Sequence, residues 1–269
     1  MNAAWGPPGT PWGDTPTVCH DAPMALNRPV GRPRSGPRRR HGATARDEII
    51  DAAAELFTQL GYAATSTRAI AEAVGIKQAS LYYHFANKEQ ILFDLLLATV
   101  QPTRAVATLL LTDPPPPPGQ AVGPAPAQLW ALAAYDVHVL CSGRWNLGAL
   151  YLLPEVHADR FAPFRRERDL LRDDYGILVE RGVEAGAFAA VEDVETATYL
   201  VFLLVEGVIS LRQETLRSGG LPMDVDTLSA TVADGALRLL GLPPGAIPPA
   251  RTVARSWLAA HALPSATSP

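Results

Sequence analysis

The segment GIKQASLYYHFANKE, residues 75–89, gathers side chains that are suited to binding nucleic acid. In a helix with 3.6 residues per turn, Gln78, Tyr82 and Tyr83 lie on one face, and Leu81 points the other way. A glutamine amide can read the edge of a base, while tyrosine hydroxyls donate to phosphates and their rings pack on sugars. These residue types at this spacing predict a surface that contacts double-stranded DNA.

Three more polar groups stand near this segment in the sequence. Thr67 and Arg68 open the preceding helix with a hydroxyl and a guanidinium, and a helix N-terminus itself favours a phosphate. Lys88 adds an ammonium at the start of the following helix. Two alternatives stay open: Thr67 can act as a helix N-cap, alone or besides binding phosphate, and the aromatic side chains, His84 above all, can brace the core.

Short helices must position these side chains. Apolar residues recur at three- and four-residue steps after Thr44, and Gly61 ends that first helix as a left-handed cap. A second helix fits 67–74, a third covers about 78–85, and a fourth starts near Asn87. Gly75 permits a tight turn, so the second and third helices form a helix-turn-helix. Two residues of the third helix, Leu81 and Phe85, are expected to dock on the core residues Ile49, Leu56, Ile70 and Val74.

The remainder of the chain also indicates helices. The proline-rich stretch 113–126 is predicted to be a loop or linker. Helical stretches follow at roughly 127–141, 143–153, 160–185, 194–217 and 225–240, and the residues after Pro243 are expected to form a loose tail. Since no alternating strand pattern appears, the predicted fold class is all-α.

Charge is distributed unevenly over the 269 residues, whose net charge is −4. Seven arginines and no acid lie between residues 22 and 46, whereas residues 47–100 hold three basic and seven acidic side chains. A basic arm on an acidic body suggests a local anionic partner.

The arm itself, residues 1–43, is rich in proline, glycine and arginine and is predicted to be disordered. Its GRPR at 31–34 resembles the core of an AT-hook, whose arginines enter the DNA minor groove. Arg38, Arg39 and Arg40 lie only a few residues before the first helix and can reach the adjacent DNA groove. The alternative is a solvated tail with non-specific, salt-dependent DNA binding.

Several other classes of protein are not indicated. Cys19 and Cys141 lie far apart and no His/Cys cluster exists, so the sequence predicts no metal site, no disulfide framework and no cofactor. It contains neither a phosphate loop nor an arranged nucleophile, and hence no candidate catalytic residue. The longest apolar run, 199–211, is broken by Glu206 and is too short to span a bilayer, and no signal pattern is present. A cytoplasmic protein without a membrane partner is expected.

Two features of the later helices suggest binding surfaces. The aromatic and polar residues of 127–153 are candidates for lining a small-molecule pocket, although aromatic residues at helical spacing also form cores. These candidates are Trp130, Tyr135, His138, Trp145 and Tyr151. His138 and Cys141 are an i, i+3 pair without a third metal ligand nearby. Helix 194–217 holds more apolar residues than one core face needs, which favours packing against a partner helix; the alternative is an intramolecular core. The residues concerned are Val201, Leu204, Val205, Val208 and Leu211.

The stretch TSTRAIAEAVGIKQASLYYHFANKEQIL, residues 65–92, closely resembles the DNA-binding module of the TetR family of bacterial transcriptional regulators. The resemblance covers about 44–92, a fifth of the chain, and implies a homodimer whose helical C-terminal domain binds a small molecule and releases DNA. It also implies that the last two long helices form a four-helix bundle across the dimer. By position it implies DNA contacts from Thr67, Arg68, Gln78, Ala79, Ser80, Tyr82, Tyr83, His84 and Lys88.

The sequence therefore predicts four regions: a tail at 1–43, a helix-turn-helix domain at 44–92, a helical effector-binding and dimerisation domain at 93–242, and a tail at 243–269. The function predicted is a ligand-responsive, DNA-binding transcriptional regulator, acting as a repressor that a small molecule releases from its operator. Two alternatives stay open, a constitutive DNA-binding protein without an effector and a helical enzyme tethered to DNA. The effector and the operator sequence are not indicated.

Overall fold

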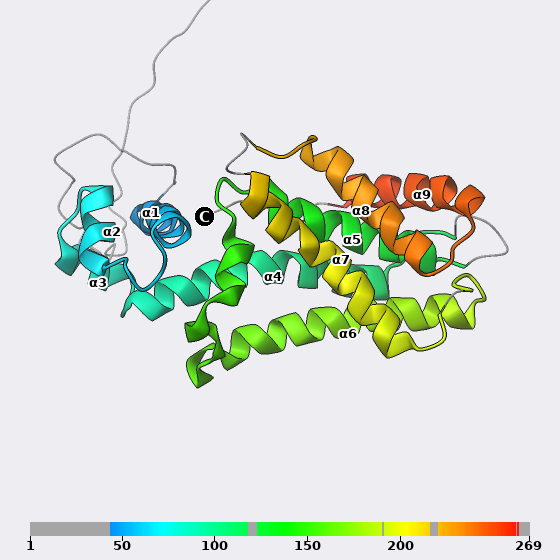
Figure 1. Ribbon diagram of the computed structural model, residues 1–269, viewed down its shortest axis with the longest axis horizontal. Coiled ribbons are helices and arrows are strands. Elements are labelled where there is room, and N and C mark those ends of the chain that lie inside the picture. Colours follow the sequence, from blue (N-terminus) through cyan, green and yellow to red (C-terminus); the bar gives the residue numbers. More distant parts are fainter. Residues whose placement is uncertain (1–43, 118–122, 190, 216–219, 262, 264–269) are drawn as a thin grey trace, which may run out of the picture. The chain divides into compact units, whose positions relative to one another are not determined.

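A computed structural model describes residues 44–117, 123–189, 191–215, 220–261 and 263. Within these ranges the regular structure is helical and contains no β-strand, which confirms the predicted all-α class (Figure 1). The predicted basic arm, with Arg38, Arg39 and Arg40, lies outside the described residues.

The first three helices are α1 (Ala45–Gln59), α2 (Thr67–Val74) and α3 (Gln78–His84). Thr44 caps α1: its hydroxyl accepts from the Asp47 main-chain N–H at 3.2 Å, and the Asp47 carboxylate accepts from the Thr44 N–H at 2.9 Å. Ser66 caps α2 by accepting from the Ala69 N–H at 3.1 Å. These side chains satisfy N–H groups that lack partners at a helix start, which explains why the helices begin where they do.

The fourth helix, α4 (Lys88–Thr112), continues from the helix-turn-helix module into the helical domain. Asn87 caps it, as predicted, by accepting from the Gln90 N–H at 2.8 Å. The Arg46 guanidinium of α1 pairs with Asp94 of α4, and this ion pair fixes the start of α1 against α4.

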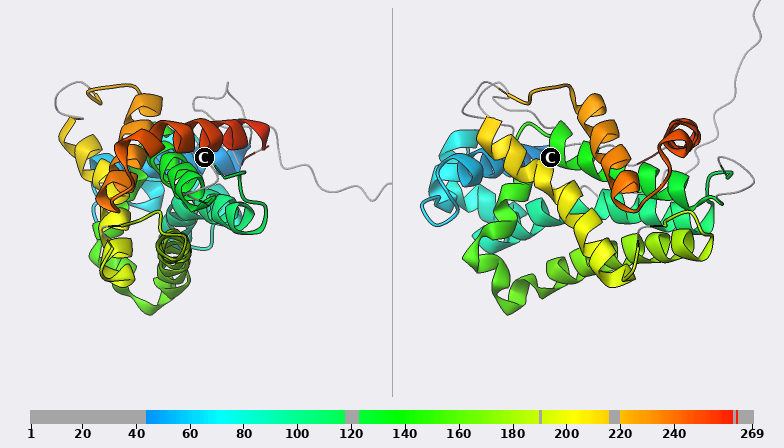
Figure 2. Two further views of the ribbon diagram at one scale, coloured as in Figure 1. Left: turned by 90° about the vertical axis from the view of Figure 1, so that its right-hand side faces the viewer. Right: turned by 45° about the vertical axis from the view of Figure 1, so that its right-hand side comes forward.

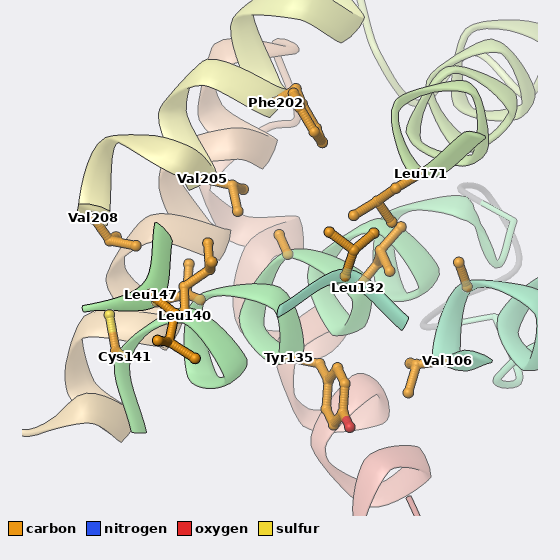
Figure 3. Packing of buried hydrophobic residues seen from close by; sticks show 14 of the residues in the cluster. Val106, Leu132, Tyr135, Leu140, Cys141, Leu147, Leu171, Phe202, Val205 and Val208 are labelled. Carbon is orange, nitrogen blue, oxygen red and sulfur yellow. The ribbon is translucent and has the colours of Figure 1, made fainter. Parts of the chain in front are cut away.

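The helical domain adds α5 (Ala125–Ser142), α6 (Ala162–Glu184), α7 (Val194–Thr215), α8 (Val225–Leu239) and α9 (Ile247–Ala260). The central helix is α5, which packs against α4, α6, α7, α8 and α9. Most of its residues are buried and apolar, as expected for a helix enclosed by others. Figure 3 shows Leu132 of α5 pointing towards Leu171 of α6, and Tyr135 of α5 pointing the other way.

Residues 143–153, predicted to be helical, do not form an α-helix. They contain a 3-10 helix at Leu147–Leu152, and 3-10 turns follow at Pro154–His157 and Asp159–Phe161. Gly148 lies so close to α7 that an added Cβ would come within 2.6 Å of the Ile209 side chain. Close approach of the two segments therefore requires a residue without a side chain here.

The expected tail after Pro243 is corrected by α9, which follows a short 3-10 turn at Pro244–Ala246. Two prolines lie in the first turn of α9, where N–H donors are not needed and proline is tolerated. One side of α9 is buried, through Ile247, Ala250, Ala254 and Trp257.

Two helices, α4 and α7, are long and apolar enough to cross a bilayer by length and composition alone. The full α7 has 22 residues and extends beyond the apolar run at 199–211, which by itself is too short to span a bilayer. Core helices of soluble proteins meet the same criterion, and α4 packs against α5 and α6.

Candidate nucleic-acid interface

The turn between α2 and α3 is set by Gly75, whose φ of +73° lies in the left-handed region. Its N–H donates to Glu72 O at 3.1 Å, and the Ile76 N–H donates to Ala71 O at 3.0 Å. These bonds end α2 and redirect the chain into α3 within three residues. The helix-turn-helix predicted from the sequence is therefore present.

One face of α3 holds it to the module core. Leu81 and Phe85 are fully buried, against a cluster that includes Ile49, Ile70 and Val74. The predicted burial of these two residues is confirmed, and α3 packs on α2. Since α3 is only seven residues long, this anchoring rather than intrinsic helix stability must keep its other face in place.

The opposite face of α3 is exposed and carries the predicted contact residues. Tyr83 is 87% exposed and Tyr82 48% exposed, which is unusual for large aromatic side chains. Gln78, Ala79 and Ser80 are exposed beside them. The face thus presents two phenols, one amide and one hydroxyl to a partner outside the protein.

A hydrogen-bonded cluster links this face to the start of α2. The Gln78 amide Nε2 donates to the Thr67 hydroxyl at 2.9 Å, and the Tyr82 hydroxyl lies 3.1 Å from the same Thr67 oxygen. Ser66 caps α2, so Thr67 is free of that role, and the alternative of Thr67 as N-cap is not what the structure shows. The cluster orients the three polar ends before any partner arrives, which reduces the entropy lost on binding.

The predicted cations differ in their surroundings. Arg68 forms an exposed ion pair with Glu72 at 2.8 Å, and because such pairs are weak its guanidinium can be redirected to a phosphate. The Lys88 ammonium donates to Tyr62 O at 2.8 Å and to Thr65 O at 2.9 Å, and lies over the Tyr62 ring. It thereby ties the start of α4 to the loop before α2.

Two other residues complete the surface. His84 is half-buried, and its ring meets that of Tyr83 edge-on with centroids 5.3 Å apart, so it supports the exposed phenol. Lys77, which the sequence reasoning missed, is exposed immediately before Gln78. Its place in the turn next to the outward face of α3 was the available signal.

The predicted pocket residues divide into two groups. Trp130, Tyr135 and His138 line one groove between α5, α8 and α9. The other two candidates, Trp145 and Tyr151, lie elsewhere. The Tyr151 hydroxyl is buried 2.6 Å from that of Thr99, and the Trp145 indole N–H donates to Asp51 of α1 at 2.9 Å.

Trp145 therefore belongs to a link between the helical domain and the helix-turn-helix module. The segment just before Trp145 is held by α7, because the Arg212 guanidinium donates to Leu140 O at 2.5 Å and to Gly143 O at 2.6 Å. Arg212 thus binds main-chain oxygens at the end of α5, and Trp145, two residues further on, contacts Asp51 of α1. These contacts form a continuous path of hydrogen bonds and chain from α7 to α1.

A second polar group lies inside the helical domain. The buried Asp136 carboxylate of α5 accepts from the Thr103 hydroxyl of α4 and from the Tyr175 hydroxyl of α6, both at 3.1 Å. Nearby, Arg168 of α6 binds both carboxylate oxygens of Glu206 of α7, at 2.5 and 2.7 Å. These bonds join four helices around one interior.

Comparison with known proteins agrees with this arrangement. Residues 49–95 match the family model described as bacterial regulatory proteins, tetR family. The negative transcriptional regulator IcaR of the biofilm operon icaADBC from Staphylococcus epidermidis is 52% identical over 46 residues, which are 17% of this chain and 25% of IcaR. The transcriptional repressor KstR2 of Mycolicibacterium smegmatis is 44% identical over 54 residues, 20% of this chain and 26% of KstR2. These matches span only about a quarter of each relative's length.

A solved structure matches over far more of the chain. The crystal structure of Mycobacterium smegmatis AmtR is 44% identical, covers 83% of this chain and 98% of its own, and superposes with a TM-score of 0.71. The likeness includes the helical domain as well as the helix-turn-helix module. The chain belongs to the TetR family of bacterial transcriptional regulators.

Proposed function

We propose that this protein is a DNA-binding transcriptional repressor that uses the outward face of α3 to read an operator. The observation that carries the proposal is the anchoring of α3 by Leu81 and Phe85, which leaves Gln78, Tyr82 and Tyr83 exposed. A recognition helix lies in the major groove, where Gln78 is suited to a base edge and the two phenols to the sugar-phosphate backbone. Two relatives, named as a negative transcriptional regulator and a transcriptional repressor, support repression rather than activation.

The protein acts as a homodimer in this proposal. Residues exposed on α7 form an apolar stripe at three- and four-residue steps, consisting of Tyr199, Leu200, Leu203 and Leu204. An exposed stripe of this kind on one long helix fits a second copy of the same helix. Of the residues singled out from the sequence, Val201, Val205 and Val208 face the core instead. Two recognition helices then read two half-sites about one DNA turn, ~34 Å, apart.

A small molecule controls DNA binding in the same proposal, through the groove that holds Trp130, Tyr135 and His138. The groove lies between α5, α8 and α9, and α8 also packs against α7, the helix that carries the apolar stripe. The bonds of Arg212 and Trp145 connect α7 to α1. A ligand that prefers one spacing of the recognition helices would shift the population towards that spacing and so change operator affinity.

The test is a footprinting experiment on the DNA upstream of the protein's own gene. It compares the purified wild-type protein with the Gln78→Ala variant. Losing a bidentate base contact should weaken operator binding about tenfold, since such contacts contribute about 1–3 kcal/mol. The matched control is Gln101→Ala on α4, where the same change is made at an exposed site. An inverted repeat protected equally by wild type and both variants would contradict the assigned face. Protection of no site at all, with only weak salt-sensitive binding, would contradict a local operator.

A further inference from the structure

One wall of the groove beside α5 is α9, a segment that was predicted from the sequence to be a loose tail. Both α8 and α9 pack on α5, and a cavity of about 460 Å³ lies between the three helices. Figure 2 shows α9 crossing beside α8 over the central helices. Trp130 and Tyr135 of α5 form the floor, and Leu258 and Arg255 of α9 form one side.

The helix α9 is firmly placed and can serve as a fixed wall. The Trp257 indole N–H donates to Asp113 O at 2.9 Å, and the His261 ring stacks on that of Trp257 with centroids 3.9 Å apart. Arg251 pairs with the buried Asp234 of α8 at 2.8 Å. Because Arg255 follows Arg251 by about one turn, it is carried to the groove by a helix already anchored at both ends.

The cation on this wall differs from its neighbours in having no acidic partner among the described residues. Arg238 and Arg251 both pair with Asp234, whereas the Arg255 guanidinium lies over the Trp130 ring, 5.7 Å from its centroid. The acid on the rim, Asp226, lies 3.7 Å from His138. The groove therefore combines an aromatic floor with one guanidinium that forms no salt bridge with a described carboxylate, although Asp226 also lines the groove.

We propose that this groove binds a small amphipathic carboxylate, whose carboxylate pairs with Arg255 and whose apolar body lies on Trp130, Tyr135 and Leu258. The proposal rests on the ligand response proposed above and names its chemical class. A guanidinium offers two parallel N–H donors to a carboxylate, and a pocket of this volume is of the size that encloses small ligands. A neutral molecule with the same body would lose the charged contact.

The experiment is calorimetric titration of the full chain, without DNA, using octanoate and octanol as a pair that differs in charge. Octanoate should bind at least about tenfold more tightly than octanol, and Arg255→Gln should remove about that factor for octanoate alone. Arg255→Lys keeps the charge and should lose less. The control is Arg166→Gln, an equal charge change at an exposed position of α6 that does not line the groove.

Three results would overturn the proposal. Equal binding of octanoate and octanol would remove the role of Arg255, and so would equal effects of the Arg255 and Arg166 variants. Octanoate binding that appears only after residues 264–269 are deleted would assign the groove to the chain's own terminus. Failure of the repressor proposal is read separately, because operator binding is measured without octanoate and this titration is measured without operator.

Discussion

The buried carboxylate of Asp136 makes the stability of the helical domain depend on pH. Burial, and secondarily the negative charge of Glu206, raises the pKa of Asp136 from 3.8 to about 7, against the opposing effect of the Tyr175 and Thr103 hydroxyls. Below pH 3.8 the group is protonated whether the chain is folded or unfolded. Between pH 3.8 and 7 the folded protein keeps the proton that the unfolded chain loses, so the free energy of unfolding falls as pH rises.

The size of this effect follows from the two pKa values. One pKa unit is equivalent to about 1.4 kcal/mol, so the rise from 3.8 to about 7 removes about 4 kcal/mol of stability once pH exceeds 7. About 3 kcal/mol of that loss falls between pH 5 and pH 8. This is a large fraction of the ~5–15 kcal/mol by which domains are stable.

The variant Asp136→Asn isolates the contribution of this one group. An amide is never ionised here, and it can still accept from one hydroxyl and donate to the other, since both Thr103 and Tyr175 have oxygens that accept. We expect the variant to gain about 3 kcal/mol relative to wild type when pH is raised from 5 to 8. Urea unfolding at several pH values measures the difference. All samples are kept at one protein concentration, so that association contributes equally to each.

The control is Asp173→Asn on α6, where the same substitution is made at an exposed carboxylate; it should not reproduce the gain of about 3 kcal/mol. A difference between Asp136→Asn and wild type that is the same at pH 5 and pH 8 would refute the reasoning, because it would mean that the carboxylate is not protonated in the folded protein near neutral pH.

Three further perturbations test other parts of the structure. Gly75→Ala meets no atom within 4 Å but must hold a φ of +73°, so we expect a loss of about 1–2 kcal/mol in urea unfolding, and an unchanged value would contradict a strained turn. Trp145→Phe keeps an aromatic six-membered ring but removes the pyrrole part with the N–H that donates to Asp51, and should cost about 1–3 kcal/mol in the same assay. Leu203→Lys, at a side chain 60% exposed on α7, should convert dimer to folded monomer in sedimentation velocity while circular dichroism stays unchanged; persistence of the dimer would place the interface elsewhere.

The helix-turn-helix module could be predicted from the sequence because its signals are local. Ser66, Gly75 and Asn87 mark helix ends through side chains or backbone freedom that act within a few residues. The outward face of α3 follows from the helical period alone, which puts Tyr82 and Tyr83 opposite Leu81. Each of these features depends on neighbours in the chain and on no distant partner.

What only the tertiary structure decided depends on residues far apart in sequence. The Lys88 ammonium donates to the main-chain oxygens of Tyr62 and Thr65. The Trp145 indole donates to Asp51 and does not line the groove. Periodicity shows that a side chain leaves one face of a helix but not which helix packs there. The groove joins Trp130 to Arg255 because α9 folds back on α5, and no local pattern encodes that return. The helix α9 is held in place because its apolar side is buried, and only the completed core provides that burial. In this position α9 forms one wall of the groove.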